Sequence, residues 1–214
     1  MSAVKILKPK LSKYLPELSL YNEHIVDETV ISEAIIKDCD IERIEAERVN
    51  FKEVVFKNVI FSEIELERAE FVDVRFENCD LSNINLREAS IHRTEFIKCK
   101  LMGMNLSEAT LRNVTFINSN MLYSYFSFSD FKQVSFEECK LSSAELQEGK
   151  FASVEFKNTD LTRCQLSGTK LKGIDLSSCE IEGLIARIED VYGVIVTPAQ
   201  AITLAGLMGI VIKG

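Results

Sequence analysis

Large apolar side chains recur at every fifth position through most of this chain. The register runs without a slip from Ile31 to Ile181, with Ala46 as its one weak member. Two residues before each of these central positions stands a smaller or β-branched residue, as Val54 does before Phe56, and the other three positions are mostly polar. A period of five fits neither an α-helix, with about 3.6 residues per turn, nor an alternating strand. The pattern therefore predicts one small structural unit stacked many times.

A second period, four times as long, lies inside the first. One set of phenylalanines recurs at this interval six times: Phe56, Phe76, Phe96, Phe116, Phe136 and Phe156. All six cysteines stand at the smaller position, and five of them share one 20-residue column: Cys39, Cys79, Cys99, Cys139 and Cys179, with Cys164 in another. Identical side chains stack when the chain returns to the same place one coil later, with strands about 4.8 Å apart. We therefore predict a solenoid with four pentapeptides per coil, a square cross-section, and the central and smaller residues pointing inward.

The repeat resembles that of the pentapeptide-repeat family, whose loose consensus is A(D/N)LXX. Matching stretches are Cys79-Asp80-Leu81-Ser82-Asn83, Thr159-Asp160-Leu161-Thr162-Arg163 and Ile174-Asp175-Leu176. The resemblance covers most of the chain. It implies an all-β fold, the right-handed quadrilateral β-helix of that family, to which this chain adds a short C-terminal helix module.

The register divides the chain into three parts. Residues 1–30 precede it, and we expect them to cap the N-terminal end, because an open solenoid end leaves strand edges and core exposed. Residues 31–181 form the β-helix, and their unbroken register leaves no room for loop insertions. Residues 182–214 are expected to form a strand and helix module for capping or dimerisation.

The C-terminal part predicts a short strand followed by a helix. Residues 191–196 are rich in valine and isoleucine, as strands are. Thr197, Pro198 and Gln200 then combine an N-cap residue, a proline at the first helical position and a glutamine at the third. The helix should run from Pro198 to Met208, and an extended segment should follow it.

This helix is apolar almost all round, which is typical of a helix buried on more than one side. One side can cover the last coil, and the other then needs a partner, most simply the same helix of a second copy. The predicted dimer positions, spaced at i, i+3, i+4 and i+7, are Ala201, Leu204, Ala205 and Met208. The alternative is a helix folded wholly onto its own chain. In pentapeptide-repeat proteins of the Qnr and MfpA type, a C-terminal helical module likewise joins two rods end to end.

The charge of the chain favours a basic partner. Its net charge is −8, which disfavours direct binding of nucleic acid, because phosphate contacts need lysine and arginine. Residues 31–110 hold most of the excess, with 17 acidic and 11 basic side chains. The candidate partner-binding residues of this acidic face are Asp40, Glu42, Glu45, Glu47, Glu63, Glu65, Glu67, Asp80, Glu88 and Glu108. The alternative is a solvated face that only keeps the rod soluble.

A second candidate surface is apolar. Leu122, Tyr123, Tyr125 and Phe128 fall at outward positions of one coil. Exposed aromatic side chains on a rigid surface commonly mark a protein interface. The alternative is a ladder of side chains that lean over one another without a partner.

The sequence predicts no catalytic, cofactor or metal site. Its two histidines lie in no metal-binding motif, and it has no nucleophile elbow and no phosphate-binding loop. It has no CxxC pair, so the in-register cysteines are expected to be buried free thiols of a protein in a reducing compartment. Without a signal peptide or a membrane-spanning segment, we expect a cytoplasmic, non-enzymatic protein.

The resemblance to the Qnr and MfpA type also implies a function. Those proteins imitate the width and charge of duplex DNA and bind DNA gyrase or topoisomerase IV. The implied role here is a homodimeric DNA mimic that modulates such a type II topoisomerase and protects it against quinolones. The alternative is a scaffold or regulator that binds another protein through the apolar positions at 122–128. A catalytic solenoid would need a cleft built by loops, which the unbroken register argues against.

Overall fold

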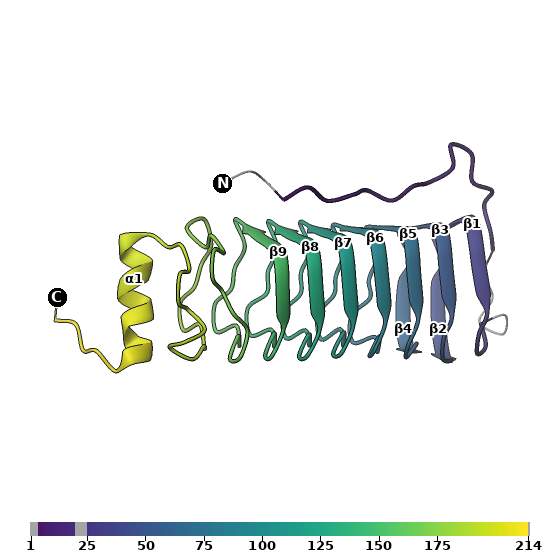
Figure 1. Cartoon of the computed structure of the whole chain (residues 1–214). Coiled ribbons are helices and arrows are strands. Elements are labelled where there is room, and N and C mark those ends of the chain that lie inside the picture. Colours follow the sequence, from purple (N-terminus) through teal and green to yellow (C-terminus); the bar gives the residue numbers. More distant parts are fainter. Residues whose placement is uncertain (1–3, 20–24, 214) are drawn as a thin grey trace.

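The parallel strands of this protein stack along one axis into a rod (Figure 1). The structure is a computed structural model that describes residues 4–19 and 25–213. Seven of the described strands form one sheet in the order β1-β3-β5-β6-β7-β8-β9, and β2 and β4 form a second. The strands are β1 (Val30–Lys37), β2 (Asp40–Glu45), β3 (Asn50–Lys57), β4 (Ile60–Glu65), β5 (Glu70–Glu77), β6 (Ser90–Ile97), β7 (Thr110–Ile117), β8 (Asp130–Glu137) and β9 (Lys150–Lys157).

Every rung between these strands pairs residues at the same 20-residue offset in the sequence. Ile36 lies opposite Phe56 in β1 and β3, and Phe96 lies opposite Phe116 in β6 and β7. Isolated bridges continue the same offset along the rod, as far as the pair of Asp175 and Ile195. The predicted 20-residue coil is confirmed.

The corners of the coil explain the period of five. A residue in the left-handed region of backbone conformation stands at every fifth position from Glu28 to Arg163, with φ between 47° and 63° at the non-glycine positions. At Gly103 in this series the position is a glycine, which adopts positive φ without steric cost. Each such residue redirects the chain, and four of them in each coil produce the square cross-section.

The phenylalanine column is stacked as the spacing predicts. Neighbouring rings from Phe56 to Phe156 have centroids 4.8–5.0 Å apart and planes within 10° of parallel. Each of these rings is buried in the interior of the rod. Aromatic pairs contribute about 0.5–1.5 kcal/mol beyond the burial of their area, so this column stabilises contact between successive coils.

The cysteine column also lies inside the rod. All six cysteines are free thiols, and five are buried, with Cys39 half-buried. The Cys139 thiol donates to the carbonyl of Phe116, at 3.4 Å. At the next coil the hydroxyl of Thr159 donates to the carbonyl of Phe136 in the same way, at 3.1 Å. Because the thiol of Cys139 and the hydroxyl of Thr159 find equivalent backbone acceptors, the column tolerates both residue types.

The N-terminal residues occupy two different places. Leu18 N donates to Ile35 O at 2.8 Å, and Ile35 N donates to Pro16 O at 2.8 Å, so residues 16–18 pair with the edge of β1. Residues 4–12 instead run along the side of the rod, over successive coils (Figure 1). This course along the side was not indicated by the sequence.

The coil continues beyond Ile181. Ile185 bridges to Gln165 and Ile195 bridges to Asp175, each at the 20-residue offset. The predicted strand at 191–196 is wrong, because this segment follows the corner geometry of the coil, with a left-handed Gly193, and pairs only through Ile195.

A short helix then closes the chain. It comprises α1 (Pro198–Ala205) and a 3₁₀ turn (Gly206–Met208). The predicted cap is confirmed, since Thr197 Oγ1 accepts from Gln200 N at 3.2 Å and Gln200 Oε1 accepts from Thr197 N at 2.8 Å. Within the described residues, no helix is long and apolar enough to cross a membrane.

The stacked column should dominate stability. We expect Phe96→Ala to lower the free energy of unfolding by about 3–5 kcal/mol, because it leaves a cavity between two rings that cannot move together. Phe128 is exposed and provides the control. Phe128→Ala should change the free energy of unfolding by less than about 0.5 kcal/mol. Chemical denaturation measures both, and equal losses would contradict the stacked core.

Thiol reactivity should follow burial. Burial raises the pKa of Cys139 to about 11 and also raises the pKa of Cys39 and of Cys179, so it is access for the reagent that separates the sites. Titration of the native chain with a chromogenic disulfide should find one reactive thiol, the half-buried Cys39, and six after denaturation. A second fast-reacting thiol in the native chain would show that the interior is open.

Candidate protein-binding surfaces

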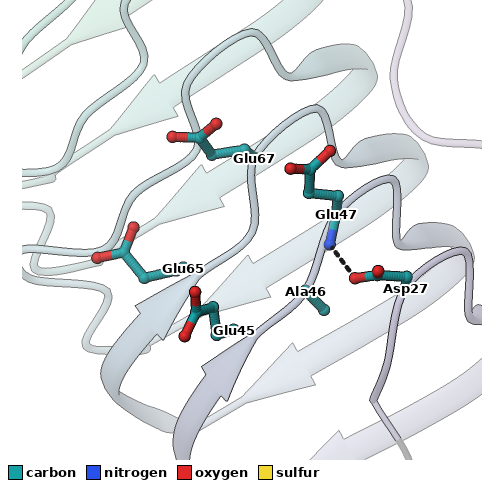
Figure 2. A pocket seen from close by; sticks show the side chains of 6 residues that line it. All are labelled: Asp27, Glu45, Ala46, Glu47, Glu65 and Glu67. Carbon is teal, nitrogen blue, oxygen red and sulfur yellow. Dashed lines mark hydrogen bonds between the residues drawn. The ribbon is translucent and has the colours of Figure 1, made fainter.

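Carboxylates from three successive coils surround a shallow hollow near the N-terminal end of the rod (Figure 2). The hollow has a volume of about 450 Å³. It is lined by Asp27, Glu45, Ala46, Glu47, Glu65 and Glu67, with no lysine or arginine among them. We call this the acidic hollow.

The repeat itself places these carboxylates together. Glu45 and Glu65 are the last residues of β2 and β4 and lie opposite each other across the ladder. Glu47 and Glu67 follow on the far side of the buried positions 46 and 66. Because each coil repeats the path of the one before, equal charges at the same position of successive coils must lie one strand apart, where they repel each other.

Hydrogen bonds hold the acidic hollow in shape. Asp27 Oδ1 accepts from the backbone amide of Glu47 at 2.8 Å (Figure 2). The amide of Asn85 donates to Glu65 Oε2 at 2.7 Å and to Glu67 Oε1 at 3.1 Å. These neutral donors fix the carboxylates without cancelling their charge.

The acidic hollow is only slightly neutralised by nearby cations. Arg68 Nη1 lies 3.0 Å from Glu47 Oε2. No described lysine or arginine forms an ion pair with Glu45, Glu65 or Glu67. Glu67 interacts electrostatically with Arg87 of the next coil, so the charge of Glu45 and Glu65 is the part most available to a cation that arrives from outside.

Most of the other predicted acidic residues are paired. The pairs are Glu63 with Arg43 (3.5 Å), Asp80 with Lys100 (3.2 Å), Glu88 with Arg68 (3.0 Å) and Glu108 with Arg87 (2.6 Å). The bond from Arg68 lowers the pKa of Glu88. Asp40 and Glu42 lie on β2, on the adjoining side of the rod. The structure thus places several carboxylates that have no cation partner at the hollow. It also adds Asp27 to the candidate residues. The sequence could have indicated Asp27, because it stands 20 residues, or one coil, before Glu47.

Part of the apolar candidate lies on the same face as the acidic hollow: Tyr125 continues the column of Glu45 and Glu65, whereas Leu122 continues the column of Glu42 on the adjoining side. Bridges at the 20-residue offset lead from Glu65 through Asn85 and Asn105 to Tyr125. Tyr123, Tyr125 and Phe128 are 58%, 42% and 64% exposed, and Leu122 is half-buried. Tyr123 and Phe128 occupy left-handed corners, with φ of 58° and 63°, where bulky side chains are uncommon.

The C-terminal helix has an incompletely covered surface. No residue of α1 is buried, although Leu204 packs against the core. Of the predicted dimer residues, Ala201 and Met208 are exposed, and Leu204 and Ala205 are half-buried. Ile202, Ile210 and Ile212 are exposed as well. A single copy therefore leaves apolar side chains in contact with water at this end of the rod.

Among the described residues, no group of three or more histidine, cysteine, aspartate or glutamate side chains is arranged to hold a metal ion. His92 is half-buried, with a ring nitrogen 3.1 Å from Arg93 Nη1. Its burial and the charge of Arg93 lower its pKa.

Comparisons with known proteins identify the repeat. A model described as pentapeptide repeat region matches residues 69–146, and one described as pentapeptide repeats (8 copies) matches residues 139–177. Together they span about half of the chain, within the part that shows the 20-residue offset. No curated protein matches the chain.

Solved structures give weaker likenesses. Full-length QnrB1, a plasmid-mediated fluoroquinolone resistance protein, is 20% identical with a TM-score of 0.49, over 86% of this chain and 97% of its own. HetL, a pentapeptide repeat protein involved in heterocyst differentiation regulation from the cyanobacterium Nostoc sp. strain PCC 7120, is 14% identical with a TM-score of 0.36, over 81% of this chain and 91% of its own. We assign the family from the repeat models and the register of the coil: the chain belongs to the pentapeptide-repeat proteins.

Proposed function

We propose that this protein is a non-enzymatic, cytoplasmic regulator that binds a type II topoisomerase, DNA gyrase or topoisomerase IV, by imitating duplex DNA. The observation that supports this most directly is the acidic hollow. It offers carboxylates on a rigid frame to a groove that is lined with lysine and arginine.

The charge density of the acidic hollow supports the comparison with DNA. Two columns of carboxylates cross it, at positions 45 and 65 and at positions 27, 47 and 67. At a strand spacing of about 4.8 Å, two charges per coil amount to about one per 2.4 Å of rod. Duplex DNA carries about one per 1.7 Å. A groove that accommodates duplex phosphates would therefore meet a comparable field over this part of the rod.

The aromatic side chains on the same face complement the charge. Charge complementarity mainly raises the rate of association, whereas buried aromatic side chains lengthen the life of a complex. A partner that covers the acidic hollow and extends along the face would reach Tyr125 and Phe128. The second candidate function, a scaffold or regulator of another protein, uses these side chains without the charge.

The C-terminal helix supports a homodimer. Its exposed apolar residues lie at one end of the rod (Figure 1), so a second copy that covers them through a two-fold axis would extend the rod end to end. A dimer of this kind would carry an acidic hollow at each outer end and would bind no cofactor and no metal.

A gyrase assay tests the proposed function. The purified chain should inhibit supercoiling by DNA gyrase, or restore it in the presence of a fluoroquinolone, at micromolar concentration. The triple variant Glu45→Gln, Glu65→Gln and Glu67→Gln should be at least 10-fold less effective, because it removes the unpaired charge of the hollow.

The matched control is Glu138→Gln, Glu180→Gln and Glu182→Gln, which changes the net charge equally at glutamates outside the hollow. It should keep full effect at 0.15 M salt, where charges more than about 8 Å apart are screened. Equal loss in both triple variants would refute the hollow as the site. Loss on Tyr125→Ala alone, with no effect of the hollow variant, would favour the scaffold function.

The dimer has its own test. Met208→Glu should convert a dimer into a monomer in sedimentation velocity, because it places a charge in the proposed interface while Met208 is exposed in the single chain. Ile188→Glu is the control, since Ile188 is an exposed apolar residue before the helix. A wild-type chain that sediments as a monomer at micromolar concentration would exclude the dimer.

A further inference from the structure

Residues 4–18, which we call the N-terminal arm, are fastened to the side of the rod mainly through their backbone. Leu7 N donates to Asn113 Oδ1 at 3.0 Å, and Lys10 N donates to Asp73 Oδ1 at 2.7 Å. The carbonyl of Lys5 accepts from Gln133 Nε2 at 3.0 Å. Further along, the Ser12 hydroxyl donates to Glu53 Oε2 at 3.0 Å.

The partners of the arm form a single column of the coil. They occupy the same corner of different coils, with Arg93 at the intervening coil: Glu53, Asp73, Asn113 and Gln133. All four have left-handed backbone conformations. We call this column the corner track. It does not share a residue with the acidic hollow. Residues 4–12 of the arm follow it across the strands, whereas residues 16–18 pair with the edge of β1 (Figure 1).

The corner track presents buried side-chain acceptors that bind the backbone of an extended peptide. Asp73 and Asn113 are only 5% and 7% exposed, and each aims its side-chain oxygen at an amide of the arm. Arg93 holds Asp73 with Nε and Nη2, both at 2.6 Å. Burial acts to raise the pKa of Asp73, but the bonds from Arg93 and from the Lys10 amide bring it below the usual range. The acceptor therefore stays charged at neutral pH.

The arm itself contributes shallow contacts. Five of its apolar residues are only half-buried: Val4, Ile6, Pro9, Leu11 and Leu15. Its four lysines, at positions 5, 8, 10 and 13, are exposed and form no ion pair with a described carboxylate. The arm thus places a cationic, extended peptide on a chain of net charge −8 without burying any of its side chains deeply.

We propose that the corner track is a binding site for an extended, lysine- and proline-containing segment of another protein, and that the N-terminal arm is its tethered competitor. Three of the four bonds contact only the backbone of the arm, so other sequences can make them. The charge of the rod favours a cationic segment, and the arm shows which pattern of apolar side chains the track accepts. Tethering gives the arm a high effective concentration, so a partner must bind more tightly than the arm or the arm must first be weakened.

This inference does not depend on the proposed topoisomerase binding, because the track and the acidic hollow are separate columns of the rod. An arm exchanged between two copies of the chain is the competing explanation. It would use the same bonds, and the measurements below distinguish it.

The experiment uses the full chain and a fluorescent synthetic peptide with the sequence of residues 4–18. Ile6→Asp together with Leu11→Asp removes two half-buried contacts of the arm and defines the released variant. The peptide should bind the released variant at least 10-fold more tightly than it binds the wild-type chain. A peptide with glutamate in place of its four lysines should bind more weakly, since it loses the charge complementarity.

The chain provides a matched control for the track. In the released variant, Asn113→Ala should abolish peptide binding, whereas Asn118→Ala should leave it unchanged. Both asparagines occupy left-handed corners of the same coil, but Asn118 is exposed and lies outside the track. Equal peptide affinity in the wild-type and released chains, or equal effects of the two asparagine substitutions, would overturn the proposal.

Amide hydrogen exchange of the wild-type chain provides a second test, which does not require the released variant to fold. In the wild-type chain, excess unlabelled peptide should accelerate exchange of the Leu7 and Lys10 amides severalfold, because it displaces the arm that donates them. Unchanged exchange at saturating peptide would refute the tethered competitor. A released variant that dimerises in sedimentation velocity, and becomes monomeric on Asn113→Ala, would assign the track to a second copy and overturn the foreign partner.

Discussion

The return of the chain to the same place after every fourth pentapeptide is the constraint on which the rest of this structure depends. It has two sources that reinforce each other: the left-handed corner at every fifth residue and the parallel ladder between successive coils. Together they place identical residues of successive coils next to each other, so that phenylalanine rings stack with centroids 4.8–5.0 Å apart inside the rod. A shift of one residue in the register would move the inward side chains to outward positions, which is why a single insertion cannot be absorbed within the coil.

The same constraint governs the surface, where stacking is not always favourable. Carboxylates at a 20-residue interval lie one strand apart and repel each other unless a cation or a donor lies between them. Along much of the rod an arginine or lysine does so, as Arg68 does for Glu88 and Arg87 does for Glu108. The Glu45 and Glu65 column of the acidic hollow departs from this pattern, because its next member is the neutral Asn85 in place of a cation. The rod therefore retains a cluster of carboxylates without a cation at the hollow.

The backbone of the coil is nearly the same on every side of the rod. The side chains on each side therefore determine what that side can bind. One face combines the acidic hollow with the exposed aromatic side chains, and the corner track on another column holds the N-terminal arm. The C-terminal helix leaves an apolar surface at one end. These three surfaces use different interactions, namely charge, backbone hydrogen bonding and apolar contact, so one chain can serve more than one partner without a loop insertion.

The fold was largely readable in the sequence, because a strict period needs only neighbouring coils to define it. The column of Phe56 to Phe156, the thiol column and the cap formed by Thr197 and Gln200 all follow from local spacing. The sequence also placed Glu45 and Glu65 on one face and Tyr125 among the outward positions. What only the tertiary structure decided is which charges remain unpaired, where the N-terminal arm lies, and that residues 191–196 continue the coil. Each of these depends on contacts between residues that are not separated by a multiple of the repeat. The hydrogen bond from the Lys10 amide to Asp73, across 63 residues, is an example. The spacing of residues along the chain therefore does not predict such contacts.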